Sequence, residues 1–122
     1  MSANEKTDHD IKGKPITLDD FFRVTLKVGK IVEAEAMRGM KKVLRVMVDL
    51  GTEKREIAIG VATYYKPEEL VGKTVIVCTN LQRRKIGEMI SNGMILAADG
   101  HGGKPVLITV DPLKVPNGAA VH

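Results

Sequence analysis

Cysteine is nearly absent from this chain of 122 residues, and tryptophan is absent altogether. The single cysteine, Cys78, excludes an intramolecular disulfide and any metal site built from several cysteines. Because it lies inside the apolar run VIVCT, we expect it to be a buried packing residue. The three histidines, His9, His101 and His122, have no partner at metal-ligand spacing. The sequence therefore predicts no metal site and no cofactor.

Long hydrophobic runs are also missing. No stretch approaches the roughly 20 apolar residues that span a bilayer, and the opening MSANEKTDHD lacks the apolar centre of a signal peptide. We therefore expect a cytoplasmic protein that does not bind membranes. Residues 1–14 have no hydrophobic periodicity, which predicts a disordered lead-in followed by one domain over residues 15–122.

Short segments that alternate apolar and polar residues predict an all-β domain. The alternation is clearest over residues 43–50, and a hairpin connection at 51–54 leads into a returning strand at 57–61. Further strands are expected over residues 24–32, 74–79, 93–98 and 106–110. Gly29 interrupts the first of these, which favours a bulge at that point. The absence of a βαβ rhythm indicates a five-stranded OB-fold Greek-key barrel with a C-terminal extension.

Two short helical turns are expected outside the strands. Thr17 or Asp19 is suited to cap a turn that contains Phe21 and Phe22. A second helical segment is expected to begin at Pro67, because proline fits the first helical position.

That second segment is expected to bring Tyr64, Tyr65 and Leu70 towards the core. The two adjacent acids that follow Pro67, Glu68 and Glu69, are explained by the helix dipole. No nucleophile, base and orienting group can be assembled from this sequence, so we do not expect an enzyme.

The positive charge is concentrated in a few places. The net charge is +4, and the segment from Arg23 to Arg45 holds seven cations against two acids. Arg83, Arg84 and Lys85 add three consecutive cations between two apolar runs. Such local concentration favours binding of a polyanion, although a solvated basic surface has the same composition.

The scarcity of aromatic residues limits which nucleic acid is expected. Single strands are usually gripped by stacking bases on aromatic side chains, and this chain has two Phe and two Tyr, none within residues 43–61. The remaining cations, amides and hydroxyls suit recognition of a folded RNA by its shape and phosphate positions.

One segment carries a family signature. Residues 80–98, NLQRRKIGEMISNGMILAA, together with FFRVTLKVGKIVEAE and YYKPEELVGK, closely resemble the tRNA-binding domain family. That family includes the C-terminal domain of many bacterial methionyl-tRNA synthetases, free-standing dimeric tRNA-binding proteins and the endothelial-monocyte-activating polypeptides. The resemblance implies an OB fold, a homodimer built with terminal segments such as 111–121, and tRNA as the partner.

The resemblance also implies the site. In the family the matching asparagine, basic residues, serine and methionine form the RNA-binding surface, and the adjacent arginine adds charge here. The secondary candidates elsewhere in the chain are Lys27, Lys30, Lys41, Lys42 and Arg45. The pattern does not fix which face of the strand Lys27 and Lys30 occupy, and ordinary solubility explains Lys41 and Lys42 equally well. The alternatives are a turn for the asparagine and the serine, and core packing for the methionine. The predicted RNA-binding residues are thus Asn80, Arg83, Arg84, Lys85, Ser91 and Met94, with Lys30 and Lys42.

We therefore expect a free-standing tRNA-binding protein without catalytic activity, which assists a methionyl-tRNA synthetase in trans. One rival is an export-associated chaperone of the CsaA type, which shares the barrel and binds unfolded polypeptide. A second rival, a general single-strand binder, is disfavoured by the lack of stacking rings.

Overall fold

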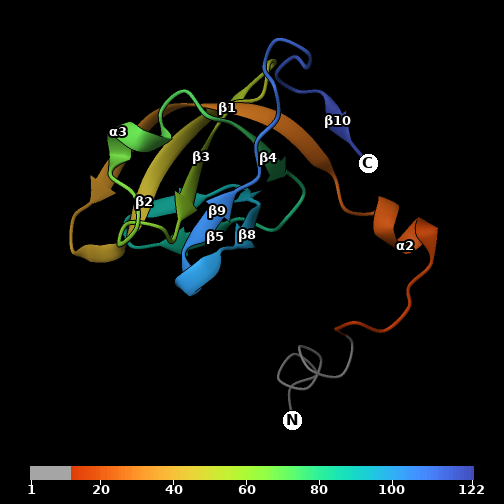
Figure 1. The fold of residues 1–122 in the computed structure, drawn as a ribbon, viewed down its shortest axis with the longest axis horizontal. Coiled ribbons are helices and arrows are strands. Elements are labelled where there is room, and N and C mark those ends of the chain that lie inside the picture. The colour runs from red at the N-terminus through yellow and green to blue at the C-terminus, as the bar shows by residue number, and fades with distance from the viewer. Residues whose placement is uncertain (1–11) are drawn as a thin grey trace.

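The computed structural model describes residues 12–122, which form a β-barrel with short helical segments (Figure 1). The predicted all-β OB fold is confirmed, while most of the predicted lead-in lies outside the described residues. The central sheet has the strand order β3-β2-β1-β4-β7, with a further strand, β10, paired to β1. These strands are β1 (Leu26–Met37), β2 (Met40–Asp49), β3 (Lys54–Ile59), β4 (Thr74–Cys78), β7 (Met94–Ile95) and β10 (Ala120–Val121).

Strand β1 connects the barrel because it pairs with three other strands. Its first half lies antiparallel to β4, from Leu26 opposite Cys78 to Lys30 opposite Thr74. Its second half pairs with β2, and β10 pairs with Leu26 and Lys27. Since β4 already occupies one side of Leu26, β10 takes the side that β2 leaves free. The segment after Asp111, predicted to be an extension, therefore contributes a strand to the sheet.

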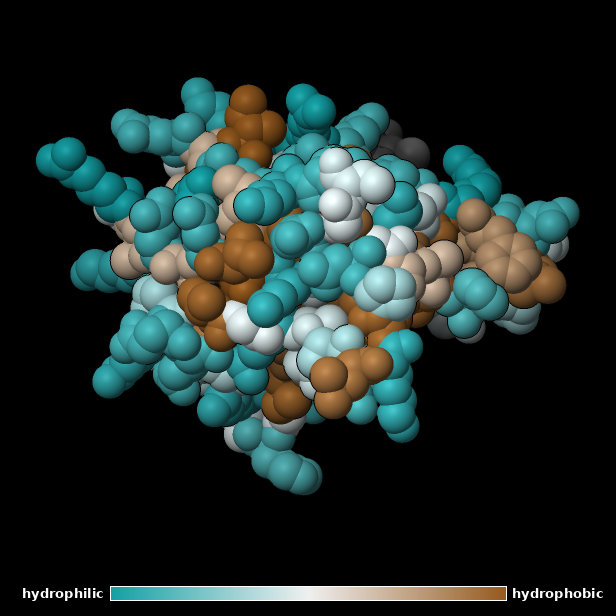
Figure 2. Space-filling view, turned by 90° about the horizontal axis from the view of Figure 1, so that it is seen from above, coloured by the Kyte–Doolittle hydropathy of each residue, from teal (hydrophilic) through white to brown (hydrophobic). Residues whose placement is uncertain are grey.

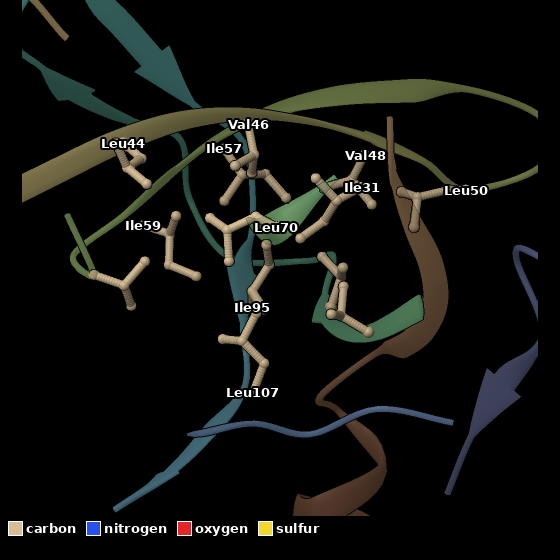
Figure 3. Packing of buried hydrophobic residues seen from close by; sticks show 13 residues of the cluster. Ile31, Leu44, Val46, Val48, Leu50, Ile57, Ile59, Leu70, Ile95 and Leu107 are labelled. Atoms are coloured by element: carbon tan, nitrogen blue, oxygen red, sulfur yellow. The ribbon is translucent and has the colours of Figure 1, made fainter. Parts of the chain in front are cut away.

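The core is built from the inward faces of β2 and β3 and from all of β4. The alternating residues Leu44, Val46 and Val48 are buried, as predicted from their spacing, and every residue of β4 is buried. Leu70, at the end of α3 (Pro67–Leu70), is fully buried and lies among the apolar side chains of the barrel (Figure 3). The predicted start of this helix at Pro67 is confirmed.

The bulge predicted at Gly29 is wrong. Gly29 pairs with Val75 in continuous register, and the irregularities of β1 lie further along, between Ile31 and Glu33 and between Ala36 and Met37. Gly29 instead allows a close approach, because a Cβ there would lie 2.5 Å from Cγ1 of Val48. Strand β1 therefore needs a residue without a side chain where it packs closely against the Val48 side chain of β2.

Tyr64 was also predicted wrongly, because its side chain is 45% exposed while Tyr65 is half-buried. The Tyr65 hydroxyl donates a hydrogen bond to the carbonyl of Pro105 (2.7 Å), and the ammonium of Lys104 lies 4.9 Å from the Tyr65 ring centroid. These contacts join the region of α3 to a hairpin formed by β8 (Ala97–Asp99) and β9 (Pro105–Leu107). The 3-10 turn η1 (His101–Gly103) connects these two strands. The strand expected over residues 93–98 is thus divided between β7 and β8.

Helix α2 (Leu18–Phe22) projects from the side of the barrel (Figure 1). Thr17 caps it as predicted, since its hydroxyl accepts a hydrogen bond from the amide of Asp20 at 3.0 Å. Phe21 and Phe22 are 40% and 54% exposed. Figure 2 shows hydrophobic side chains gathered at the end of the molecule where α2 lies. No helix within residues 12–122 has the length and apolar character needed to cross a membrane.

Candidate nucleic-acid interface

The three consecutive cations lie on and beside a β-hairpin that the sequence pattern did not indicate. Strand β5 (Arg84–Ile86) pairs with β6 (Met89–Ser91), with Arg84 opposite Ser91 and Lys85 opposite Ile90. Side chains alternate along a strand, so Arg84 and Ser91 share the face towards the barrel. Lys85 and the 57% exposed Ile90 share the outer face.

This hairpin is docked against the edge of the barrel. The amide of Asn92 donates a hydrogen bond to the carbonyl of Glu56 in β3 at 2.9 Å. At the other end of the hairpin, Gly87 lies against the tip of the β1–β2 hairpin. A Cβ on Gly87 would lie 2.9 Å from Sδ of Met40, and its φ of +60° also favours glycine. The cations are thus carried on a hairpin held at both ends.

An open cleft of about 630 Å³ lies beside this hairpin. It is lined by five of the predicted residues, Asn80, Arg83, Arg84, Ser91 and Met94, together with Leu81, Gln82 and Gly93. The fold therefore brings together side chains that are up to fourteen positions apart in the sequence. We call this group the cationic cleft.

The other three predicted residues do not line the cationic cleft. Lys85 is exposed on the outer face of the same hairpin. Lys42 is exposed on β2, two residues beyond Met40, which packs against the hairpin turn. Lys30 is exposed in the middle of β1, between Asp49 and Thr74. Lys30 is four positions along β1 from Leu26, and this spacing corresponds to roughly 13 Å along a strand.

Two of the cleft residues direct their hydrogen-bonding groups to the chain itself. Asn80 accepts a hydrogen bond from the amide of Thr25 at 2.9 Å and donates one to the carbonyl of Arg23 at 2.5 Å. Ser91 is only 2% exposed, and its hydroxyl accepts from the amide of Ala58 at 2.9 Å. Met94 differs from both, since its side chain is 46% exposed on β7 and lies at the surface.

Arg55 is a site residue that the sequence analysis missed. Its guanidinium donates to the carbonyl of Thr79 at 2.5 Å, directly before the cationic segment, and pairs with the Glu53 carboxylate at 2.7 Å. The hydrogen bond from Arg55 to the Glu53 carboxylate, together with the Arg55 charge, holds the pKa of Glu53 below its usual value. The charges of Lys27 and Arg83 lower this pKa further. No sequence signal distinguishes Arg55 from a solvated arginine on an alternating strand.

A second, apolar hollow adjoins the cationic cleft. It has a volume of about 610 Å³ and shares Asn80, Leu81 and Met94 with the cleft. Val24, Leu26, Cys78 and Leu96 supply most of its remaining lining, beneath the α2 junction. Among residues 12–122, no cluster of His, Cys, Asp and Glu is arranged to hold a metal ion.

Known proteins resemble this chain in both sequence and fold. Residues 26–120 match the family described as a putative tRNA-binding domain. A methionine–tRNA ligase from Methanocella arvoryzae is 50% identical over 103 residues, which cover 84% of this chain and 15% of that protein. The chain thus spans less than a fifth of the length of the ligases it matches.

Solved structures show the same barrel. A MetRS-related protein from Pyrococcus horikoshii has a TM-score of 0.84 at 38% identity, covering 89% of this chain and 99% of that one. The chaperone CsaA from Bacillus anthracis has a TM-score of 0.79 over 89% of this chain and all of its own. Its identity of 21% shows a shared fold alone. From the match over residues 26–120, the chain belongs to the tRNA-binding domain family.

Proposed function

We propose that this chain binds tRNA through the cationic cleft and the outer face of the β5–β6 hairpin, and that it recognises the folded shape of the RNA. The observation that carries this proposal is the placement of Arg84 and Lys85 on one docked, exposed hairpin, with Arg83 directly before it. Arg84 faces the cleft and Lys85 faces outward, so the pair presents positive charge in two directions to phosphates of a folded backbone.

The surface around these cations suits shape recognition better than base stacking. Neither the cationic cleft nor the hairpin carries an aromatic side chain. Met94 offers exposed apolar contact at the edge of the cleft, where it can pack against a ribose or base edge. This combination of cations with little stacking surface favours a structured RNA over an extended single strand.

We further infer that the chain acts as a binding protein with no reaction of its own, in the cytoplasm together with tRNA, and assists a methionyl-tRNA synthetase. The similarity to methionine–tRNA ligases supports this partner. We also infer a homodimer. Exposed apolar side chains near both ends of the described chain support it, because they include Leu18 at 67%, Phe22 at 54% and Leu113 at 94% exposure.

The test is a binding titration that compares tRNA with duplex DNA and single strands of equal charge. We expect tRNA to bind most tightly. Each neutralised phosphate contributes roughly 0.7–0.9 to the slope of log affinity against log salt. Replacing Arg84 and Lys85 by alanine should therefore lower the magnitude of that slope by roughly 1.4–1.8 and weaken binding.

The matched control removes two charges elsewhere. Lys12 and Lys14 are exposed and lie before α2, away from the cleft lining. Their double alanine variant has the same net charge as the Arg84 and Lys85 variant and should retain most of the affinity. If both variants lose affinity equally, binding is general charge attraction and the assigned site is wrong.

One observation favours a second candidate, an unfolded-polypeptide binder. The apolar hollow beside the cationic cleft offers a surface for hydrophobic side chains, and the chaperone CsaA shares the fold. This candidate predicts that a reduced, unfolded protein competes with tRNA, and that Leu81→Asp abolishes the competition. Failure of unfolded chains to bind at micromolar concentration would remove the candidate.

A further inference from the structure

The segment that carries the cations is fixed by polar side chains at both of its ends. We propose that Asn80, Ser91 and Arg55 are positioning residues. They hold the β5–β6 hairpin and Arg83 before it in a set geometry and do not themselves contact RNA. The effect of these residues on tRNA preference rests on the proposed function. The hydrogen bonds that position the hairpin are present in the protein without RNA.

Asn80 fixes the start of the segment. The two ends of its side-chain amide bind the two backbone groups on either side of Val24, the carbonyl of Arg23 and the amide of Thr25. The backbone of Thr79 adds a third bond, from its amide to the carbonyl of Thr25 at 2.9 Å. The Asn80 oxygen also accepts from the Cys78 thiol, so of the four hydrogen bonds that the amide can make, one N–H is left for another partner.

Ser91 fixes the end of the segment. Ala58 lies on β3, the edge strand of the sheet, and its amide points away from β2 towards the hairpin. The Ser91 hydroxyl fills that position, and the amide of Asn92 bonds to the carbonyl of Glu56 on the same edge. Although Ser91 belongs to the cleft lining, its side chain is only 2% exposed and leaves almost no surface for a ligand.

Arg55 supports the segment from the opposite direction. The Arg55 guanidinium donates a hydrogen bond to the carbonyl of Thr79. The amide of Thr79 in turn donates to the carbonyl of Thr25, so both backbone groups of Thr79 are held. The Arg55 side chain is 17% exposed and its charge is already paired with Glu53. This arginine therefore adds little to the field that an incoming phosphate meets.

Fixed cations discriminate between anions, whereas mobile cations only attract them. A folded RNA presents phosphates at set positions. A hairpin that is already held in place loses little conformational entropy when it binds them. If Asn80 or Ser91 is replaced by alanine, the number of cations is unchanged. The salt dependence should then persist, while the preference for tRNA over other polyanions falls.

Hydrogen exchange in the free protein tests the positioning directly. Asn80→Ala should speed exchange of the Thr25 amide and of the Arg84–Ile86 amides by roughly tenfold, as expected for the loss of two hydrogen bonds. Gln82→Ala is the matched control, because Gln82 is an amide in the same cleft. Its side chain makes none of the hydrogen bonds found among the described residues. This control should leave exchange at those amides unchanged.

Binding supplies the second measurement. For Asn80→Ala, the ratio of tRNA to duplex DNA affinity should fall about threefold to tenfold with the salt slope unchanged. Ser91→Ala should lower the same ratio and expose the Ala58 amide to exchange. Reduced tRNA affinity in Asn80→Ala without faster exchange would show a direct RNA contact and overturn the inference.

The two proposals fail separately. If the unmodified protein binds tRNA no better than duplex DNA, the proposed function is wrong, while the exchange result still decides the positioning. If exchange is unaffected in both variants, the positioning is wrong whatever the chain binds.

Discussion

Gly29→Ala provides a demanding test of the close packing between Gly29 of β1 and the side chains of β2 and Leu50. A Cβ at this position would lie 2.5 Å from Cγ1 of Val48 and 2.8 Å from Cδ2 of Leu50. Both partners are buried, and Val48 is β-branched, so neither can turn aside without disturbing the core. Overpacking of this kind costs about 1–3 kcal/mol.

The assay is chemical and thermal unfolding of the variant. At roughly 4 °C per kcal/mol for a domain of this size, the melting temperature should fall by about 4–12 °C. Gly60→Ala is the matched control, because nothing lies within 4 Å of a Cβ at Gly60. That substitution should be neutral or should stabilise the fold by up to about 1 kcal/mol. Equal stability of the two alanine variants would refute the close packing as described.

Three further predictions concern a helix cap, the core and an ion pair. Thr17→Ala should destabilise the protein by about 0.5–2 kcal/mol, seen as faster exchange of the Asp20 amide. Leu70→Ala should cost about 2–5 kcal/mol in urea unfolding, since Leu70 is fully buried, and a cost under 1 kcal/mol would contradict its place in the core. Because Arg55 lowers the pKa of Glu53, their pairing stabilises the fold above the ordinary glutamate pKa of about 4.3 and is lost as the pH falls through the lowered value. Melting curves of Glu53→Gln should therefore lie below those of the unmodified protein at pH 7 and converge with them in acid; a constant difference would exclude the linkage.

Strands with a repeated pattern could be predicted from the sequence, because burial imposes that pattern directly. The alternation that ends at Leu50 and the apolar run that contains Cys78 each form a strand where expected. The signature between Asn80 and Ala98 also predicted the family correctly. In each case the information is local, within one strand or one motif.

The features that were missed depend on distant contacts. A three-residue strand such as β5 is too short to show a period, so the Arg-Arg-Lys run resembled a loop. The need for glycine at position 29 comes from Val48 and Leu50 on a neighbouring strand. Likewise, the internal bonds of Asn80 involve residues 55 and 57 positions away. No pattern along the chain reports such partners.

The pairing of β10 with β1 has a consequence for how the molecule forms during synthesis. Leu26, near the start of the domain, pairs with Cys78 of β4 on one side and with Val121 of β10 on the other. The second pairing cannot form before Val121 has been synthesised. A nascent chain must therefore carry an incomplete first strand until residues 120–121 have been synthesised and can pair with it. Such long-range closure slows folding and leaves an edge open to wrong partners in the meantime.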